Sequence, residues 1–310
     1  MSNIKPRLIV GGASKSGTTA LFYYLRQHPD ICLSAKKELH FFSRICLEQT
    51  SRGPGDRYVL AEIPNTFDEY MSFFNHCNGG KIAIDISPSY LYHYESADMI
   101  KTHLGEVKIV FILRNPVEKA FSQYMHLVGE GREKLGFEDA LAKEDEREVA
   151  RYSDMWLYKR SGFFADAIDH FFKVFGRDNV KVVFFEEFLS DPQGILHEIC
   201  LFSGIDGEFR FEPVYDVNRS GHPKSALLAK LIAPNSLTYF LRRIIPQGIG
   251  RIGRKLIKDW NVADKPKLSD DIRSLLLTSY IDDIRRLELT LGRKSGWISK
   301  QDLMKFEDKE

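Results

Sequence analysis

Short apolar runs alternate with segments of helical periodicity along the first two thirds of the chain. Five runs are rich in branched or aromatic residues and too short for helices: residues 8–10, 31–33, 81–85, 108–113 and 180–185. Apolar positions at helical spacing lie between them, beginning with residues 20–25. Two strands that are joined by one helix in so short a unit pair in parallel. The pattern therefore predicts an α/β fold with a parallel sheet.

Capping residues and periodicity predict further helices. Thr66 caps a helix over residues 66–75, with Glu69 at its third position. Longer helices are expected over residues 155–175, 192–203 (capped by Asp191) and 268–291, and a charge-rich, exposed helix over residues 136–151. Polar residues just beyond the strands, such as Ser87 and Ser89, are expected at the edge of the sheet where ligands bind.

Length and charge limit the classes of protein that the chain can be. Its 310 residues are enough for one α/β domain spanning residues 1–310, with an α/β core over 1–225 and a helical part over 226–310. The formal net charge of +1 argues against a general nucleic-acid binder.

The cysteines show no pattern of a metal site. Cys32, Cys46, Cys77 and Cys200 lie far apart, without the paired spacing of a zinc site, and a disulfide framework is not expected in a chain this long. We therefore expect reduced thiols and no metal.

The N-terminal segment bears on localisation. Residues 1–7 are polar and lead directly into the first strand, and no later apolar run is long enough to span a bilayer. We expect a cytoplasmic protein without a signal peptide or transmembrane segment. Residues 226–260 are apolar with basic punctuation; short helices packed on the core are favoured, and a peripheral contact with a membrane or an anionic acceptor is the alternative.

A glycine-rich loop, Gly11 to Thr19, joins the first strand to the first helix. Glycines let the backbone approach an anion, and the first N–H groups of the helix point towards it. Lys15 adds a positive charge, and Thr18 and Thr19 add hydroxyl donors. The loop predicts a site for a phosphate-like group.

The spacing within this loop is not that of a Walker A loop, which needs glycine where this chain has Ser14 and Ile9. Read from Gly12 to Thr19, the pattern G-x-x-K-x-G-T-T resembles the 5′-phosphosulfate loop of sulfotransferases that use 3′-phosphoadenosine 5′-phosphosulfate (PAPS). The resemblance implies a P-loop-like sulfotransferase fold of three layers, with residues 1–225 as the PAPS-binding core. It assigns donor binding to the following loop residues: Lys15, Ser16, Gly17, Thr18 and Thr19.

A second segment resembles the heparan sulfate branch of this family, in which K-E-P-H-F-F carries the general base. This chain matches at Lys37, Glu38 and His40 and at the two phenylalanines that follow, and it has Leu39 in place of proline. The resemblance makes Glu38 the catalytic base and Lys15 the catalytic cation. His40 is a fallback base, and a packed structural histidine is the alternative reading. A lysine of the same branch is replaced here by Ile86.

A third segment, beginning at Arg114, resembles the family's 3′-phosphate site, R-N-P-x-x-R-A-x-S-x-Y. Asn115 caps a helix that begins with proline, which places Arg114 at the end of a strand. A guanidinium offers a planar set of donors to a phosphate, and Ser122 adds a hydroxyl. Lys119 replaces the second arginine and keeps its charge.

Later segments also resemble the family. Residues 158–163 correspond to the part that flanks the adenine, and Lys224, with Arg219 less securely, corresponds to a basic loop that closes over the nucleotide. The Gly292–Trp297 segment, in which Trp297 follows a glycine-containing turn, resembles the C-terminal segment of many members. Lys101-Thr102-His103-Leu104 matches the base segment of cytosolic sulfotransferases in its letters, but it leads directly into a strand, so His103 is the less favoured base.

These segments together predict a PAPS-dependent sulfotransferase that needs no metal. A carbohydrate or glycoconjugate acceptor is favoured by the match at Glu38, and a small lipid or phenolic metabolite is the alternative. A nucleotide kinase is a competitor of another class, although neither a Walker loop nor carboxylates for magnesium are found. A non-catalytic nucleotide-binding protein is a further competitor, which Glu38 argues against.

Overall fold

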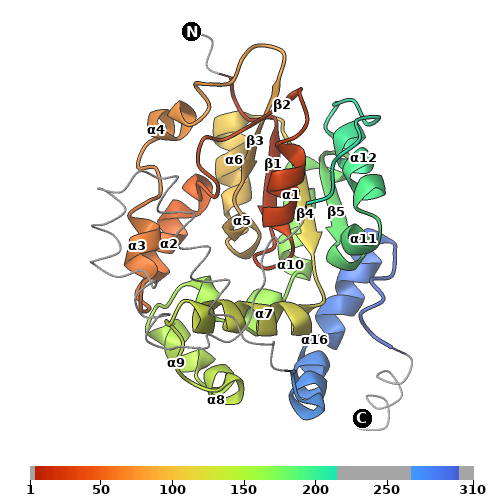
Figure 1. Cartoon of the computed structure of the whole chain (residues 1–310). Coiled ribbons are helices and arrows are strands. Elements are labelled where there is room, and N and C mark those ends of the chain that lie inside the picture. The colour runs from red at the N-terminus through yellow and green to blue at the C-terminus, as the bar shows by residue number, and fades with distance from the viewer. Residues whose placement is uncertain (1–3, 215–266, 300–310) are drawn as a thin grey trace.

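The computed structural model describes residues 4–214 and 267–299, and its centre is a five-stranded parallel sheet (Figure 1). The strands are β1 (Leu8–Gly12), β2 (Ile31–Leu33), β3 (Ile82–Ile86), β4 (Lys108–Leu113) and β5 (Val180–Phe184). Their order is β2-β3-β1-β4-β5, so β1 is central and pairs with β3 and β4. The expected parallel sheet is confirmed. Because all strands run the same way, the loops that follow β1, β3 and β4 meet at one edge of the sheet.

Helices surround this sheet. The α-helices among the described residues are α1 (Thr18–Leu25), α2 (Arg44–Thr50), α3 (Asp56–Leu60), α4 (Phe67–Ser72), α5 (Ser89–Tyr92), α6 (Ser96–Leu104), α7 (Pro116–Gly129), α8 (Phe137–Ala142), α9 (Glu144–Val149), α10 (Ala165–Phe175), α11 (Phe185–Ser190), α12 (Pro192–Phe202) and α16 (Asp270–Leu291). Short 3₁₀ helices are η1 (Phe41–Ser43), η2 (Asp154–Trp156), η3 (Arg160–Gly162) and η4 (Arg177–Asn179).

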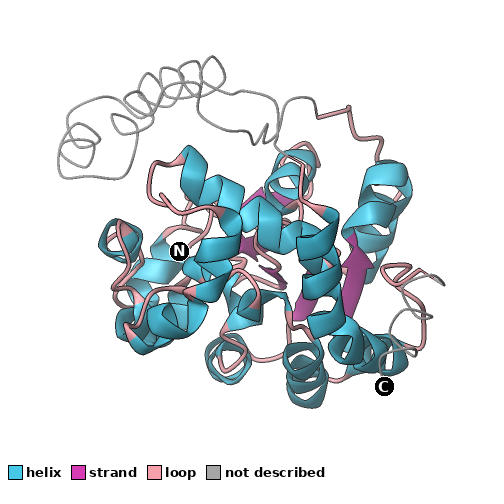
Figure 2. Ribbon diagram, turned by 90° about the horizontal axis from the view of Figure 1, so that it is seen from below, coloured by secondary structure: helices cyan, strands magenta, loops and turns pink. Residues whose placement is uncertain are grey.

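Two hydrophobic cores lie on the two faces of the sheet. Successive residues of a strand point to opposite faces, so Leu8 and Val10 of β1 enter one core and Ile9 enters the other. The first core is closed by α1 and α12, and the second by helices that include α6, α10 and α16. Helices lie on both sides of the strands in Figure 2. The three-layer arrangement is confirmed.

The predicted helix caps are present. Thr66 Oγ1 accepts a hydrogen bond from Glu69 N at 3.1 Å, and Asp191 Oδ1 accepts one from Gly194 N at 2.9 Å. Asn115 Oδ1 accepts one from Val117 N at 3.0 Å, with proline as the first residue of α7. These local signals can be recognised in sequence because each involves residues two or three positions apart.

The continuous helix expected over residues 155–175 is wrong. The segment forms η2 and η3, and only α10 is α-helical. Its N-terminus is capped from a distance: the Asp283 carboxylate of α16 accepts hydrogen bonds from Phe164 N at 2.8 Å and Ala165 N at 3.2 Å. A cap that lies more than a hundred positions away cannot be read from local periodicity.

The exposed helix expected over residues 136–151 is also wrong in part. It is divided into α8 and α9, and Glu144 and Arg147 are buried. The Glu144 carboxylate accepts hydrogen bonds from Lys159 N at 2.5 Å and Arg160 N at 3.2 Å. Arg147 pairs with buried Glu133 at 2.7 Å. Some charges of this segment therefore support the interior instead of facing solvent.

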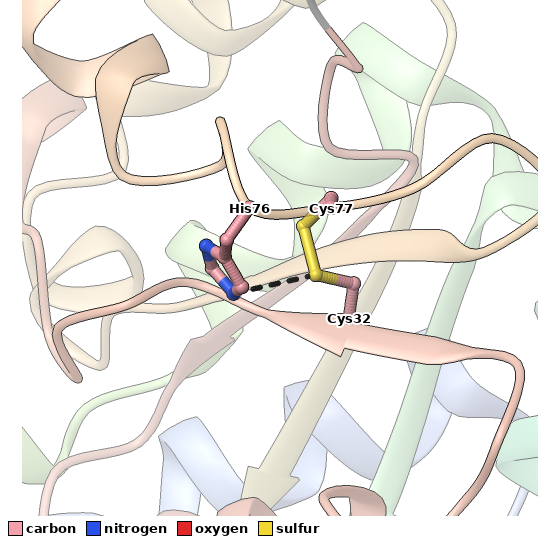
Figure 3. Close-up of side chains that lie close together, drawn as sticks. All are labelled: Cys32, His76 and Cys77. Atoms are coloured by element: carbon pink, nitrogen blue, oxygen red, sulfur yellow. Dashed lines mark hydrogen bonds between the residues drawn. A yellow bond between two sulfur atoms is a disulfide. The ribbon is translucent and has the colours of Figure 1, made fainter.

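The prediction of four reduced cysteines is wrong, because Cys32 and Cys77 form a disulfide (Figure 3). They are 45 positions apart, and folding brings the end of β2 beside the segment that follows α4. Cys46 and Cys200 are free thiols. Among the described residues, Cys32, His76 and Cys77 are the only group of three side chains placed to hold a metal ion, and both sulfurs are joined to each other.

Some expectations remain outside these observations. No helix in the described parts of the chain is both long and apolar enough to cross a membrane. The basic segment 226–260 lies outside the described residues, and the division of the chain at residue 225 stays a prediction.

Candidate active site

The glycine-rich loop lies at the edge of the sheet where β1 ends and α1 begins. Ala13 N donates to Ile112 O of β4 at 2.8 Å, which fixes the loop against the neighbouring strand. Lys15 and Gly17 have positive φ angles of 65° and 92°. A Cβ on Gly17 would lie 2.8 Å from the Phe185 ring, so the position suits only glycine. The first turn of α1 receives no side-chain cap. Its N–H groups therefore face the loop without a competing acceptor from the cap residue.

Ser16 is a buried polar residue of this loop. Its side chain is fully buried, and its Oγ has no hydrogen-bond partner among the described residues. Buried hydroxyls are normally satisfied, because burial without a partner costs free energy. The 5′-phosphosulfate end of PAPS would present acceptor oxygens to this hydroxyl and to the first turn of α1. The residues present therefore fit the donor that the loop pattern predicts.

Arg114 lies next to this loop, directly after β4. Its Nη1 donates to Lys15 O at 3.3 Å, and its guanidinium lies 4.9 Å from the centre of the Phe185 ring. Nη2 lies 3.8 Å from Glu118 Oε2. Burial lowers the pKa of Arg114, although the two nearby glutamates oppose this. The two segments predicted to bind the donor, 99 positions apart, are thus brought together.

The turn that carries Arg114 is supported by Glu186 of α11. One carboxylate oxygen accepts a hydrogen bond from Asn115 N at 3.1 Å, and the other accepts one from Trp297 Nε1 at 3.1 Å. Trp297 packs edge-on against Phe184, with 5.0 Å between the ring centres. The segment after α16 is therefore tied to the start of α7. Glu186 was not singled out by the sequence analysis.

Lys37 and Glu38 approach the loop from the other side of β1. The Lys37 ammonium pairs with Glu38 Oε1, and burial followed by the charge of Lys15 lowers the pKa of Lys37 to about 7. The charge of Lys15 thus acts on the lysine that pairs with the predicted base. Glu38 has a φ of 64°, which is uncommon outside glycine, and its side chain is 39% exposed. A strained backbone that holds a partly exposed carboxylate is typical of functional sites.

His40 is held in the interior next to Glu38. Its Nδ1 lies 2.6 Å from Ser89 Oγ, its backbone N–H donates to Ser87 Oγ at 3.0 Å, and its Nε2 lies 3.7 Å from Glu38 Oε2. Burial lowers the pKa of His40 to about 4, against the opposing charges of Asp154 and Asp85. The imidazole is therefore neutral near pH 7 and is a weaker base than an unperturbed histidine.

Asp85 is a buried hydrogen-bond acceptor in this region. It is fully buried at the end of β3 and accepts hydrogen bonds from Ser87 Oγ at 2.7 Å, Tyr90 OH at 2.8 Å and Tyr70 OH at 3.1 Å. Burial raises its pKa, although these donors oppose the shift. Ser87 thus connects Asp85 to the backbone of His40. The sequence reasoning missed Asp85, for which the available signal was a carboxylate inside an apolar strand.

Asp154 and His93 form a second buried pair that sequence reasoning missed. Their nearest atoms, Oδ1 and Nε2, are 3.8 Å apart. Burial lowers the pKa of His93, but Asp154, followed by Cys46, more than offsets this and raises it to about 9. The same carboxylate influences the pKa of His40. No local sequence pattern connects residues of η2 with the end of α5.

Other predicted residues lie away from these reactive groups. His103 is in the last turn of α6, where its Nδ1 lies 2.9 Å from Met99 O and its ring packs against Phe41 and Phe67. That environment is structural. Ile86, which replaces a lysine of the resembling branch, is 2% exposed and belongs to the core beneath α1.

Helix α7 carries Ser122 and Lys119. Ser122 is partly exposed, and its contact with a 3′-phosphate stays a prediction. Lys119 is buried and donates to Gln123 Oε1 at 2.8 Å and Ser161 Oγ at 2.7 Å. Burial lowers its pKa to about 7, although the charges of Asp154 and Glu144 oppose this shift. Its ammonium links α7 to η3.

The remaining predictions concern adenine and the closing loop. Tyr158 is buried and donates to Glu133 Oε2 at 2.7 Å, whereas Phe163 is 43% exposed. The adenine contact of this segment is untested. Lys224 and Arg219 lie outside the described residues.

Comparison with known proteins places this geometry in a family. A family model described as "Sulfotransferase family" matches residues 6–209. The crystal structure of a sulfotransferase from Alicyclobacillus acidocaldarius is similar to this chain, with 31% sequence identity and a TM-score of 0.75. The match covers 94% of this chain and 98% of the bacterial chain.

Curated relatives include two human enzymes. Heparan sulfate glucosamine 3-O-sulfotransferase 6 is 28% identical over 205 residues, which are 64% of this chain and 52% of the relative. Heparan sulfate glucosamine 3-O-sulfotransferase 3B1 is 28% identical over 200 residues, 64% of this chain and 46% of the relative. The chain thus spans about half the length of the curated relatives it matches. The family match and the bacterial structure, taken with the loop and strand arrangement described above, show that this chain belongs to the sulfotransferase family.

Proposed function

We propose that this chain transfers a sulfuryl group from PAPS to a hydroxyl or amine of a carbohydrate or glycoconjugate. The observation that carries the proposal is the buried, unpartnered hydroxyl of Ser16 in the loop after β1, together with the bond from Arg114 to Lys15 O that joins the two predicted donor-binding segments. Similarity to heparan sulfate 3-O-sulfotransferases supports the acceptor class.

Donor binding is divided between two segments of the chain. Ser16 and the N–H groups at the start of α1, with Thr18 and Thr19, would hold the 5′ end, and Arg114 with Ser122 would hold the 3′-phosphate. When bound, PAPS supplies the activated sulfuryl group. The contact between Arg114 and Lys15 O keeps the two segments at a constant separation, which favours transfer through positioning. Lys224 would add a cation from the late basic loop.

A cation of the site would stabilise the negative charge that develops during transfer. Lys15 is the group that would stabilise the negative charge that grows on the bridging oxygen as the bond to sulfur breaks. A donor fixed in advance by the backbone costs little reorganisation during the reaction. The positive φ of Lys15 and the bond from Arg114 to its carbonyl oxygen restrict the loop in this way.

Proton removal falls to Glu38. A carboxylate that is partly exposed can reach an acceptor hydroxyl, and its pairing with Lys37 fixes one oxygen while the other faces His40. His40 is neutral and close to Ser89 Oγ, and its lowered pKa makes it a weaker base than an ordinary histidine. No step in this scheme uses a metal ion.

The donor assignment is tested by binding. We expect 3′-phosphoadenosine 5′-phosphate (PAP), the desulfonated product, to raise the melting temperature strongly and ATP with magnesium to raise it much less. Equal stabilisation by ATP, or loss of transfer after chelation of divalent ions, would favour a kinase.

The acceptor is tested with radiolabelled PAPS. The panel contains heparan oligosaccharides, simple glycosides, a phenol and a hydroxysteroid. Label transfer to the saccharides supports the proposal, whereas transfer to the phenol or steroid alone would assign the chain to small-molecule sulfation. Binding of PAP without transfer to any acceptor would support the non-catalytic reading.

A further inference from the structure

Cys32, Cys77 and His76 form a cluster at β2, the strand that leads into the catalytic segment, residues 34–40, which carries Lys37 and Glu38. Cys32 lies in β2, the edge strand of the sheet, and Cys77 follows α4. Both cysteines are nearly buried, at 7% and 8% exposure, while His76 is exposed. The His76 Nε2 lies 3.5 Å from Cys32 Sγ (Figure 3). The exposed imidazole of His76 therefore contacts the sulfur of Cys32.

That contact has a chemical consequence for the two sulfurs. In thiol–disulfide exchange the attacking thiolate displaces one sulfur as a thiolate, and exchange is faster when the displaced thiolate is stabilised. A histidine next to a cysteine sulfur provides such stabilisation. His76 touches Cys32 Sγ, so Cys32 is the better leaving group and Cys77 Sγ is the sulfur that is attacked.

The same cluster is attached to the segment that carries Glu38. One residue separates Cys32 from Ser34, where the segment 34–40 begins. Ala35 N donates to Phe73 O at 2.9 Å, and Cys77 N donates to Phe74 O at 2.9 Å. The disulfide therefore joins the same two pieces of backbone as the bond between Ala35 and Phe73. Since β2 pairs with β3 alone among the described strands, this covalent link is a main restraint on the edge strand.

We propose that Cys32 and Cys77, assisted by His76, are a reversible thiol–disulfide exchange site whose reaction partner is a dithiol reductant. One thiolate of the reductant attacks Cys77 Sγ and forms a mixed disulfide, and Cys32 leaves as a thiolate beside His76. The second thiol of the reductant then displaces Cys77. Two electrons and two protons pass to the protein, which ends with two thiols, while the reductant ends as a disulfide.

The exchange alters the segment that holds Lys37 and Glu38. In the oxidised protein the segment is clamped, and in the reduced protein it is held by hydrogen bonds and by the pairing of Lys36 with Glu62. Transfer is therefore faster in the oxidised state, whereas donor binding at residues 12–19 and at Arg114 is the same in both. The effect on transfer rests on the proposed function, but the exchange chemistry does not.

The exchange is tested first without any activity measurement. The full chain, purified without reductant, is alkylated and mapped by mass spectrometry. We expect Cys32 and Cys77 to be linked, and to become alkylated after dithiothreitol. The rate of reduction is then compared with His76→Ala and with His170→Ala, a control that removes a histidine paired with Asp98 on another surface. Reduction should slow roughly tenfold in His76→Ala alone. Equal rates in all three proteins, or cysteines that are never linked, would overturn the site.

The coupling to the catalytic segment is tested by proteolysis and transfer. Trypsin should cut after Lys36 or Lys37 several times faster in the reduced protein. A Cys32→Ser, Cys77→Ser variant should behave like the reduced protein with or without dithiothreitol. Unchanged cleavage after verified reduction would overturn the coupling. If cleavage changes as expected but neither redox state transfers label to any acceptor, the proposed function fails and the exchange site stands. If transfer occurs equally in both states, the control of transfer fails.

Discussion

The two sides of the candidate active site, the proposed donor side and the proposed acceptor side, are built in different ways. The donor side consists of the loop after β1 and the turn after β4, two neighbouring strands of the sheet. Its candidate groups are the first N–H groups of α1 and side chains that lie within a few positions of Gly17 or Pro116. The acceptor side consists of the segment after the edge strand β2, and it is held by side chains of α4, α5 and the turn after β3.

This difference predicts how strongly each side of the site responds to mutation. A site made from backbone N–H groups keeps its shape while the strands keep their register. A site held by a chain of buried side chains, from Asp85 through Ser87 to His40, depends on every member, because a buried polar group left without its partner is costly. We therefore expect mutations on the donor side to change affinity and mutations on the acceptor side to change turnover or stability.

The largest effect is expected on the acceptor side, at Glu38. Glu38→Gln keeps the size of the side chain but cannot accept a proton, so turnover should fall by ~10²–10⁴-fold while PAP binding and melting temperature stay near wild type. Steady-state rates with labelled PAPS and calorimetry with PAP measure both. Glu106→Gln, at an exposed surface position, is the control. A fully active Glu38→Gln enzyme would remove Glu38 as the base.

Lys15 connects the two sides and comes next. Lys15→Met keeps the length of the side chain and removes its charge, so turnover should fall roughly 10²–10³-fold, as for other losses of one group that stabilises transition-state charge. The dissociation constant of PAP should change much less, because the charge matters most as the bridge to sulfur breaks. A loss confined to affinity would make Lys15 a donor-binding residue alone.

Arg114 is the sharpest probe of the donor side. Arg114→Ala removes hydrogen bonds to a charged group, each worth ~1.5–3 kcal/mol, so PAP should bind at least tenfold more weakly, and turnover at saturating donor should fall less because only the contact with Lys15 O is lost there. Arg273→Ala is a matched control, because Arg273 also pairs with Glu118 but starts from α16. Normal PAP affinity in Arg114→Ala would contradict the 3′-phosphate assignment.

The acceptor side should also respond to acid through His40. Its folded pKa of about 4 lies below the unfolded value of 6.5, so the unfolded chain binds more protons and stability is lost as pH falls from 6.5 to 4. The shift corresponds to about 3 kcal/mol. Denaturant melts across this window should show a shallower loss for His40→Gln. An identical pH profile for the variant would mean that His40 is not buried as a neutral group.

His93, which pairs with Asp154, gives a pH dependence of stability opposite in sign to that of His40. Its folded pKa of about 9 lies above the unfolded value of 6.5, so its contribution to stability is complete below pH 6.5 and is lost as pH rises through 9. His93→Gln should therefore lower stability at pH 6 more than at pH 9. A destabilisation that does not depend on pH would show that packing, and not the pair with Asp154, is responsible.

The smallest effect is expected at His103. His103→Ala removes a ring from an aromatic cluster, so the melting temperature should fall slightly while turnover stays near wild type. A dead His103→Ala enzyme beside an active Glu38→Gln enzyme would exchange their roles and would move the acceptor towards phenols or hydroxysteroids.

Much of the donor side could be predicted from the sequence, for a physical reason. The loop after β1 and the capped start of α7 depend on residues a few positions apart, so their patterns survive in the one-dimensional order. The acceptor side could be predicted only at Glu38 and His40. The supports at Asp85, Ser89 and Asp154 come from other elements, and their contacts arise only when β3, α5 and η2 pack together. The Cys32–Cys77 bond and the cap from Asp283 were missed for the same reason.

The link from Asn115 through Glu186 to Trp297 makes the protein its own optical reporter. The Trp297 indole N–H donates to the carboxylate that also receives the backbone N–H after Arg114, and the ring is almost fully buried. Indole emission is sensitive to the polarity and charge around the ring, so a change at the start of α7 would alter the fluorescence of Trp297. The other two tryptophans are Trp156 and Trp260, so a Trp297→Phe variant identifies the part of the emission that comes from Trp297. Donor occupancy could then be followed in real time without a dye, a label or a coupled enzyme.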